Sequence, residues 1–77
     1  MNINHDGRGN VYVELQSWDF DGKRELLRLT RVEKEIGKTN VRFQIRETNG
    51  KLRAMGPEFP LDGVEEIISA LLKIKDI

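Results

Sequence analysis

Several residue types are absent or scarce in this 77-residue sequence, and each absence excludes a class of structure. There is no cysteine, so a disulfide framework and thiolate metal sites are excluded. Aromatic residues are 6% of the chain, and the single histidine is His5. No apolar run approaches the roughly 20 residues of a membrane span, and the first residues, MNINHDGRGN, lack the hydrophobic region of a secretory signal. These absences predict a small intracellular protein that does not enter a membrane.

The shortage of nucleophiles and bases argues against an enzyme. A Ser/His/Asp arrangement would need His5 to be ordered beside Ser17 or Ser69. The stretch DFDGKRE lacks the full ligand pattern of a calcium loop, and GKLRAMG lacks the Gly-Lys-Ser/Thr end of a phosphate loop. We therefore expect a non-enzymatic protein with no metal and no cofactor.

The composition is that of one small folded domain. Charged residues are 34% of the chain and hydrophobic residues 38%, which is typical of a folded protein rather than a disordered one. A chain this short buries only about 60% of the surface that its unfolded form exposes. Its stability must therefore come from compact packing, from a partner or from self-association.

Charge is abundant and unevenly placed along the chain. Lysine plus arginine number 13 and aspartate plus glutamate 13, so the net charge is zero. From Lys23 to Arg53, however, ten basic residues stand against four acidic ones, so this segment carries +6 and the rest of the chain −6. Such asymmetry predicts one basic surface and one acidic surface.

Alternation of apolar and polar residues predicts strands along most of the chain. We expect a flexible arm over residues 1–9 and a single domain over residues 10–77. The strands are predicted at NVYVELQSW, KRELLRLTRVEKE, VRFQIRET and KLRAM, and a helix is the open alternative for the second. Asp21-Gly22 and Asn49-Gly50 are favoured hairpin pairs. Gly56-Pro57 and Pro60 are expected to end regular pairing.

From Asp62 onward the period changes to that of a helix. An apolar stripe recurs at helical spacing, with Asp62 as the expected N-cap and Glu65 completing a capping box. The stripe consists of Val64, Ile67, Ile68, Leu71 and Leu72. The predicted fold class is therefore α+β: a four-stranded curved antiparallel meander followed by one C-terminal helix on one face of the sheet.

The basic residues alternate with the apolar ones in the clearest strand. If Val41, Phe43 and Ile45 face the helix, then Arg42 and Arg46 face the open side of the sheet. By the same rule, Arg28 and Thr30 share a face, as do Lys51 and Arg53. Two interpretations remain open, a solvated sheet face and a cationic surface that follows a phosphate backbone. Tyr12 and Trp18 are the aromatic side chains best placed to stack on bases.

The order of these elements resembles that of the transcriptional coactivator family "positive cofactor four" and its bacterial and phage relatives. The resemblance lies in VRFQIRET, in the basic stretch GKLRAMG after a short turn, and in EFPLDGVEEIISALL. Members are small dimeric single-stranded-DNA-binding proteins with a four-stranded curved sheet and a C-terminal helix. Three features differ here: the Asn49-Gly50 turn is shorter than the usual loop, the helix after Asp62 is short, and Thr48 stands where an aromatic residue often follows the Ile-Arg-Glu run.

The resemblance implies roles for particular residues. Arg46 matches the arginine of the Ile-Arg-Glu run, Lys51 and Arg53 match the basic strand, and the cations of the first hairpins match loosely. With the alternation, the expected nucleic-acid-binding residues are Lys23, Arg24, Arg28, Lys38, Arg42, Arg46, Lys51, Arg53 and Trp18. The expected dimer interface consists of Val64, Ile67, Ile68, Leu71 and Leu72.

We therefore expect a homodimeric protein that binds single-stranded DNA, or alternatively RNA, and acts in replication, recombination or transcription beside the proteins of those processes. The resemblance implies a cytoplasmic or nucleoid-associated location, or the host cytoplasm if the chain is phage-encoded. The alternative function is a protein-interaction module whose basic sheet face docks an acidic partner.

Overall fold

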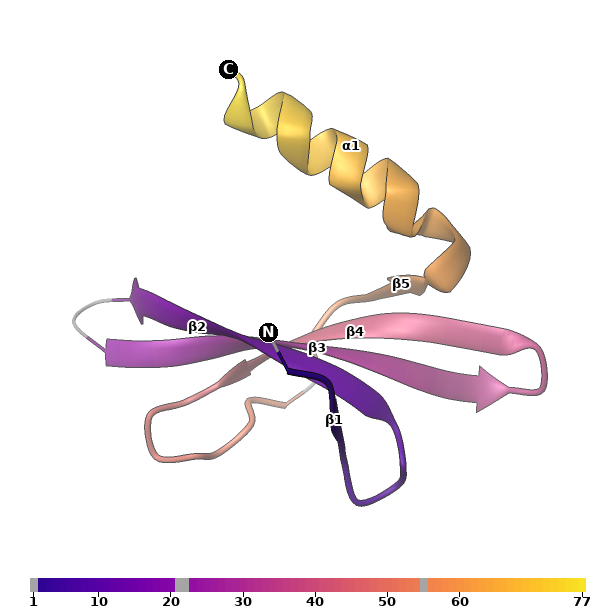
Figure 1. Ribbon diagram of the computed structural model, residues 1–77, viewed down its shortest axis with the longest axis horizontal. Helices are drawn as coiled ribbons and strands as arrows, with labels where there is room; N and C mark the ends of the chain where they lie inside the picture. The colour runs from indigo at the N-terminus through magenta and orange to yellow at the C-terminus, as the bar shows by residue number, and fades with distance from the viewer. Residues whose placement is uncertain (1, 21–22, 55) are drawn as a thin grey trace.

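A single antiparallel sheet dominates the computed structural model, which describes residues 2–20, 23–54 and 56–77, without the side chains of residues 16–20 and 23–24. Within these residues the sheet has five strands in the order β1-β2-β3-β4-β5 (Figure 1). They are β1 (Asn4–His5), β2 (Val11–Phe20), β3 (Lys23–Glu35), β4 (Lys38–Arg46) and β5 (Glu58–Pro60). The 3-10 helix η1 (Leu61–Gly63) then leads into α1 (Val64–Lys75). The predicted α+β class with a C-terminal helix is confirmed.

The three long strands β2, β3 and β4 form the body of the sheet. Their register places Val13 beside Leu29 and Leu29 beside Phe43, so the apolar residues of three strands share one face. The segment KRELLRLTRVEKE is a strand, as predicted, and not the alternative helix. Its long pairing with both neighbours outweighs its local helical spacing. The expected turn at Asp21-Gly22 lies outside the described residues.

The strands at the two edges differ from the prediction. KLRAM was expected to be the fourth strand, but Leu52 forms only an isolated bridge with Arg46. The edge of β4 is instead paired with β5, although proline was expected to end pairing there. At the other edge, β1 pairs with β2 inside the segment expected to be a flexible arm. The sheet therefore has five strands in the described residues, one more than predicted.

Gly56 explains why the chain returns to β4 after the turn at Asn49-Gly50. The turn forms as predicted, with the Gly50 N–H donating to the Glu47 carbonyl oxygen at 2.9 Å and Gly50 at a φ of 86°. Further on, the Phe43 N–H donates to the Pro57 carbonyl oxygen at 2.9 Å. A Cβ atom on Gly56 would collide with the Phe43 carbonyl group, so only glycine permits this approach.

The helix α1 forms where predicted but is not packed on the sheet. Its N-cap is Gly63 without a side-chain hydrogen bond, and Asp62 lies in η1, so the predicted capping box does not form. The helix stands apart on one side of the sheet (Figure 1). Ile68, Leu71 and Leu72 are 50%, 58% and 54% exposed, so the predicted packing of the stripe on its own sheet is wrong.

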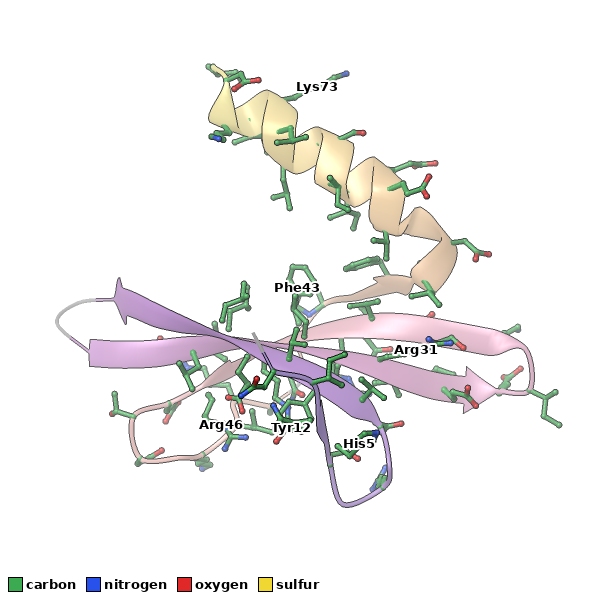
Figure 2. The ribbon with its side chains drawn as sticks, viewed as in Figure 1. His5, Tyr12, Arg31, Phe43, Arg46 and Lys73 are labelled. Carbon is green, nitrogen blue, oxygen red and sulfur yellow. The ribbon has the colours of Figure 1, made fainter. Side chains whose placement is uncertain are left out.

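The two faces of the sheet are buried to different extents. We call the face with Leu29, Phe43 and their apolar neighbours the apolar face; it points toward the side of α1 (Figure 2). Its side chains are only half-buried, although Phe43 and Phe59 meet edge to face with ring centroids 5.4 Å apart. On the opposite polar face, Arg28 and Thr30 are only 6% and 4% exposed. The most buried side chains thus include polar ones.

Candidate nucleic-acid interface

The polar face gathers arginines from neighbouring strands, as the alternation predicted. The register places Arg28 beside Gln44 and Thr30 beside Arg42, and Arg46 beside Leu26 on the same side. Arg46 and Tyr12 therefore lie on the opposite side of the sheet from Phe43 (Figure 2). β1 and the segment between β4 and β5 also extend on this side (Figure 1). The face is therefore flanked by chain at both edges.

Arg28 and Tyr12 form the centre of the polar face. The Arg28 guanidinium carbon lies 3.6 Å from the centroid of the Tyr12 ring, a close cation–π contact. Arg28 Nε and Thr30 Oγ1 have no hydrogen-bond partner among the described residues. A buried cation stacked on a phenol ring is held mainly by that ring. The Tyr12 ring, which was expected to stack on bases, therefore stacks on Arg28 in this structure.

Arg46 is held between two parts of the chain. Its Nε donates to Glu14 Oε2 at 2.7 Å, and its Nη1 donates to the Gly50 carbonyl oxygen at 3.0 Å. The Arg46 and Glu14 side chains are 27% and 18% exposed, so this ion pair is partly shielded from water. Arg46 therefore ties the turn at Asn49-Gly50 to β2.

Arg42 belongs to a cluster centred on Glu58. Arg42 Nε lies 2.8 Å from Glu58 Oε2, Lys34 Nζ lies 3.2 Å from the same oxygen, and Asn40 Nδ2 donates to Oε1 at 3.2 Å. The hydrogen bond from Arg42, followed by that from Asn40, lowers the pKa of Glu58 from 4.5 to about 2. The Glu58 carboxylate is therefore ionised at neutral pH, and it is shared between Arg42 and Lys34.

Arg53 lies on the other face of the sheet from Arg46. The bridge between Arg46 and Leu52 places Leu52, rather than Arg53, on the polar face. Arg53 Nε donates to Glu47 Oε1 at 3.0 Å, and its Nη2 pairs with Glu25, which is 5% exposed. The predicted surface that joined Arg53 to Arg46 does not form.

The remaining predicted residues are scattered. Lys38 pairs with Glu35 at 3.4 Å at the exposed β3–β4 turn, and Lys51 is exposed. The side chains of Lys23, Arg24 and Trp18 lie outside the described residues. The expected dimer-interface residues of α1 share one helix face, and none of them is buried. The structure thus brings together Arg28, Arg42 and Arg46 of the predicted cations.

The carboxylate partners of the arginines were missed by the sequence analysis. Glu58 acts from β5, a strand that was not predicted, so no pattern could place it beside Arg42. Glu14 could have been found, because it lies two residues after Tyr12 in the predicted first strand and therefore shares the face of Tyr12. Arg8 and Arg31 were also missed; they line one hollow together with the β1–β2 loop.

No candidate metal site is present in the described part of the chain. There, no group of three or more His, Cys, Asp or Glu side chains could hold a metal ion. None of the described helices is long and apolar enough to span a bilayer. A scan against protein-family models finds no matching family, and searches of curated proteins and of solved structures find no significant match.

Proposed function

We propose that the chain is a non-enzymatic, homodimeric protein that binds single-stranded nucleic acid through the polar face. One observation carries this proposal: Arg28, Arg42 and Arg46 lie on one face of the neighbouring strands β3 and β4, and Arg28 stacks on the Tyr12 ring. A guanidinium binds a phosphate through two parallel N–H donors, and its flat face stacks on bases. The resemblance to the positive cofactor four family agrees with this proposal and stays a prediction.

The carboxylates on the polar face define how binding would proceed. Glu14 holds Arg46 and Glu58 holds Arg42, so a phosphate must replace a carboxylate at each arginine. Binding by exchange keeps the arginine side chains ordered before the ligand arrives and lowers the entropy lost on binding. It also predicts that the glutamates compete with nucleic acid. Neutralising them should therefore strengthen binding.

The dimer is supported by apolar surface that the single chain leaves open. α1 exposes a stripe of large apolar side chains, and the apolar face contains a groove of about 320 Å³. The groove is lined by Leu27, Phe43, Gln44, Ile45, Arg53, Ala54, Gly56 and Pro57. Small monomeric domains rarely leave such surfaces in water. The simplest partner with matching chemistry for these surfaces is a second copy of the chain.

The charge of α1 favours antiparallel pairing with its own copy. Glu65 and Glu66 lie in the first turn, and Lys73 and Lys75 lie in the last turn. A twofold axis across two antiparallel helices places the acidic end of each beside the basic end of the other. The interface is then self-complementary in both apolar contact and charge, which a closed twofold dimer requires.

The decisive experiment measures oligothymidine binding at two salt concentrations. Arg42→Ala and Arg46→Ala should each weaken binding about tenfold and reduce the salt slope by about one. Glu58→Gln and Glu14→Gln should strengthen binding by severalfold, because they release an arginine for phosphate. Lys73→Ala is the matched control, since Lys73 is a cation on the side of α1 that points away from the sheet (Figure 2). Equal affinity in all five variants would reject the polar face.

The alternative, docking of an acidic protein partner, also has an observation in its favour. Arg42 and Arg46 of the polar face already bind carboxylates of this chain. A partner segment rich in glutamate could take the place of Glu14 and Glu58. This alternative predicts equal competition by single-stranded and duplex oligonucleotides against a polyglutamate peptide. Preferential displacement by the single strand would favour nucleic-acid binding instead.

A further inference from the structure

A second hollow lies at the start of β2. It measures about 570 Å³ and lies where the β1–β2 loop meets the second half of β3. It is lined by Arg8, Gly9, Asn10, Val11, Arg31, Val32 and Glu33. Two arginines from segments far apart in sequence thus open onto one concave surface.

The loop that carries Arg8 is held in place by one carboxylate. Asp6 Oδ1 accepts hydrogen bonds from the Arg8 N–H at 2.8 Å and from the Asn10 N–H at 2.9 Å. The Asp6 N–H in turn donates to the Asn10 carbonyl oxygen at 2.9 Å, and Gly9 adopts a φ of 82° that suits glycine. The backbone at Arg8 is therefore positioned by the fold, beside a strand that fixes Arg31.

Arg8 and Arg31 differ in their partners from three other arginines of the chain. Arg42, Arg46 and Arg53 all form ion pairs with glutamates. Among the side chains that the structure describes, Arg8 and Arg31 form none. An anion that enters this hollow is bordered by two arginines whose side chains no carboxylate of the described residues holds. Glu33 is the one acidic residue in the lining, so the hollow keeps a net positive charge.

We propose that this hollow is a phosphate-binding site in which Arg8 and Arg31 hold one phosphate group. Two guanidinium forks supply enough donors for several oxygens of a single phosphate. The phosphate comes from a nucleic-acid backbone or from a free phosphate compound, and both have the same chemistry at the site. Glu33 limits the affinity by repulsion. The site does not include Arg42 or Arg46, so it can be confirmed or rejected independently of the proposed function.

The test uses the full chain and two probes, inorganic pyrophosphate and oligothymidine. When a probe is titrated into the protein, the amide chemical shifts of Gly9, Asn10 and Val32 should change most. Arg8→Ala and Arg31→Ala should each weaken binding of the probe about tenfold, and Glu33→Gln should strengthen it. All three side chains are exposed, so their replacement should leave the fold intact. Lys73→Ala again controls for the loss of one positive charge.

The outcomes separate the site from its ligand and from the proposed function. Arg8- and Arg31-dependent binding of both probes supports a site for backbone phosphate. Dependence with pyrophosphate alone supports the site, assigns it to free phosphate compounds and removes it from nucleic-acid binding. If Arg8→Ala and Arg31→Ala behave like Lys73→Ala with both probes, the inference is overturned, even where oligothymidine still binds through Arg42 and Arg46.

Discussion

The polar and apolar faces of the sheet are built from the same strands, yet their side chains are buried to different extents within one chain. On the polar face, arginines and glutamates pair across strands and Arg28 is 6% exposed. On the apolar face, the large side chains stay half-buried and the helix that was expected to cover them stands apart. The difference indicates that Arg42 and Arg46 of the polar face find carboxylate partners within the chain, whereas the apolar surface stays uncovered, as the proposed dimer requires. Four substitutions test this comparison.

The largest effect is expected from Leu71→Asp on the exposed stripe of α1. A carboxylate in an apolar interface is unpaired, and a twofold dimer contains the change twice, so the dissociation constant should rise about a thousandfold or more. Sedimentation velocity measures the mass. Ser69→Asp is the matched control, because Ser69 lies beside Glu66 and Lys73 on the polar side of α1. A wild-type monomer at high concentration would mean that the apolar face remains open in solution.

A smaller effect, a loss of stability of the fold, is expected from Gly56→Ala. This substitution tests how tightly the segment that lines the apolar groove is held against β4. The new methyl group meets the Phe43 carbonyl and should lower the free energy of unfolding by about 2 kcal/mol. Gly7→Ala is the control, because no atom lies within 4 Å of a Cβ at that position. Urea denaturation compares the two variants. Equal midpoints would show that the segment at Gly56 can move away from β4 at little cost.

On the polar face, Glu58→Gln should change the pH dependence of stability. The pKa of Glu58 is about 2 in the folded chain against an ordinary value of 4.5, so its pairing stabilises the fold above pH 4.5. This stabilisation is lost as the pH falls toward 2. The variant should lose about 1 kcal/mol at neutral pH and show a flatter stability curve in that window. An unchanged slope by urea denaturation would mean that Arg42 does not hold the carboxylate in solution.

The smallest effect is expected at the exposed β3–β4 turn. Lys38 and Glu35 pair at 3.4 Å with side chains 72% and 70% exposed. Such surface pairs contribute little, so Lys38→Ala should change the free energy of unfolding by less than about 0.5 kcal/mol. Thermal denaturation at low and high salt is a sufficient measurement. A larger loss of stability would indicate a further partner for Lys38. Side-chain exposure would then not be enough to rank the expected effects.

The sequence predicted the parts of the fold that depend on local alternation. The strict period of two around Phe43 gave the strand and placed Arg42 and Arg46 on the opposite face, because side-chain direction is fixed by the pleat. The position of Glu58 could not be predicted, since β5 pairs only through the close approach at Gly56. The helix was predicted, but its distance from the sheet was not. Helical periodicity shows which side is apolar and carries no information about what covers it.

The short strands at the two edges of the sheet limit how copies of this chain can meet. β1 has 2 residues and β5 has 3, and β5 ends at Pro60, which has no N–H to donate. Longer, flatter edges present rows of unpaired amide groups on which strands of other chains add and aggregates grow. At the β4 edge, β5 ends at a proline and gives a further strand little to pair with. At the other edge, β1 pairs only with Val11 and Tyr12, so β2 beyond Tyr12 has no partner strand on its outer side among the described residues. The outer side of β2 is therefore the edge at which a strand of another copy can add.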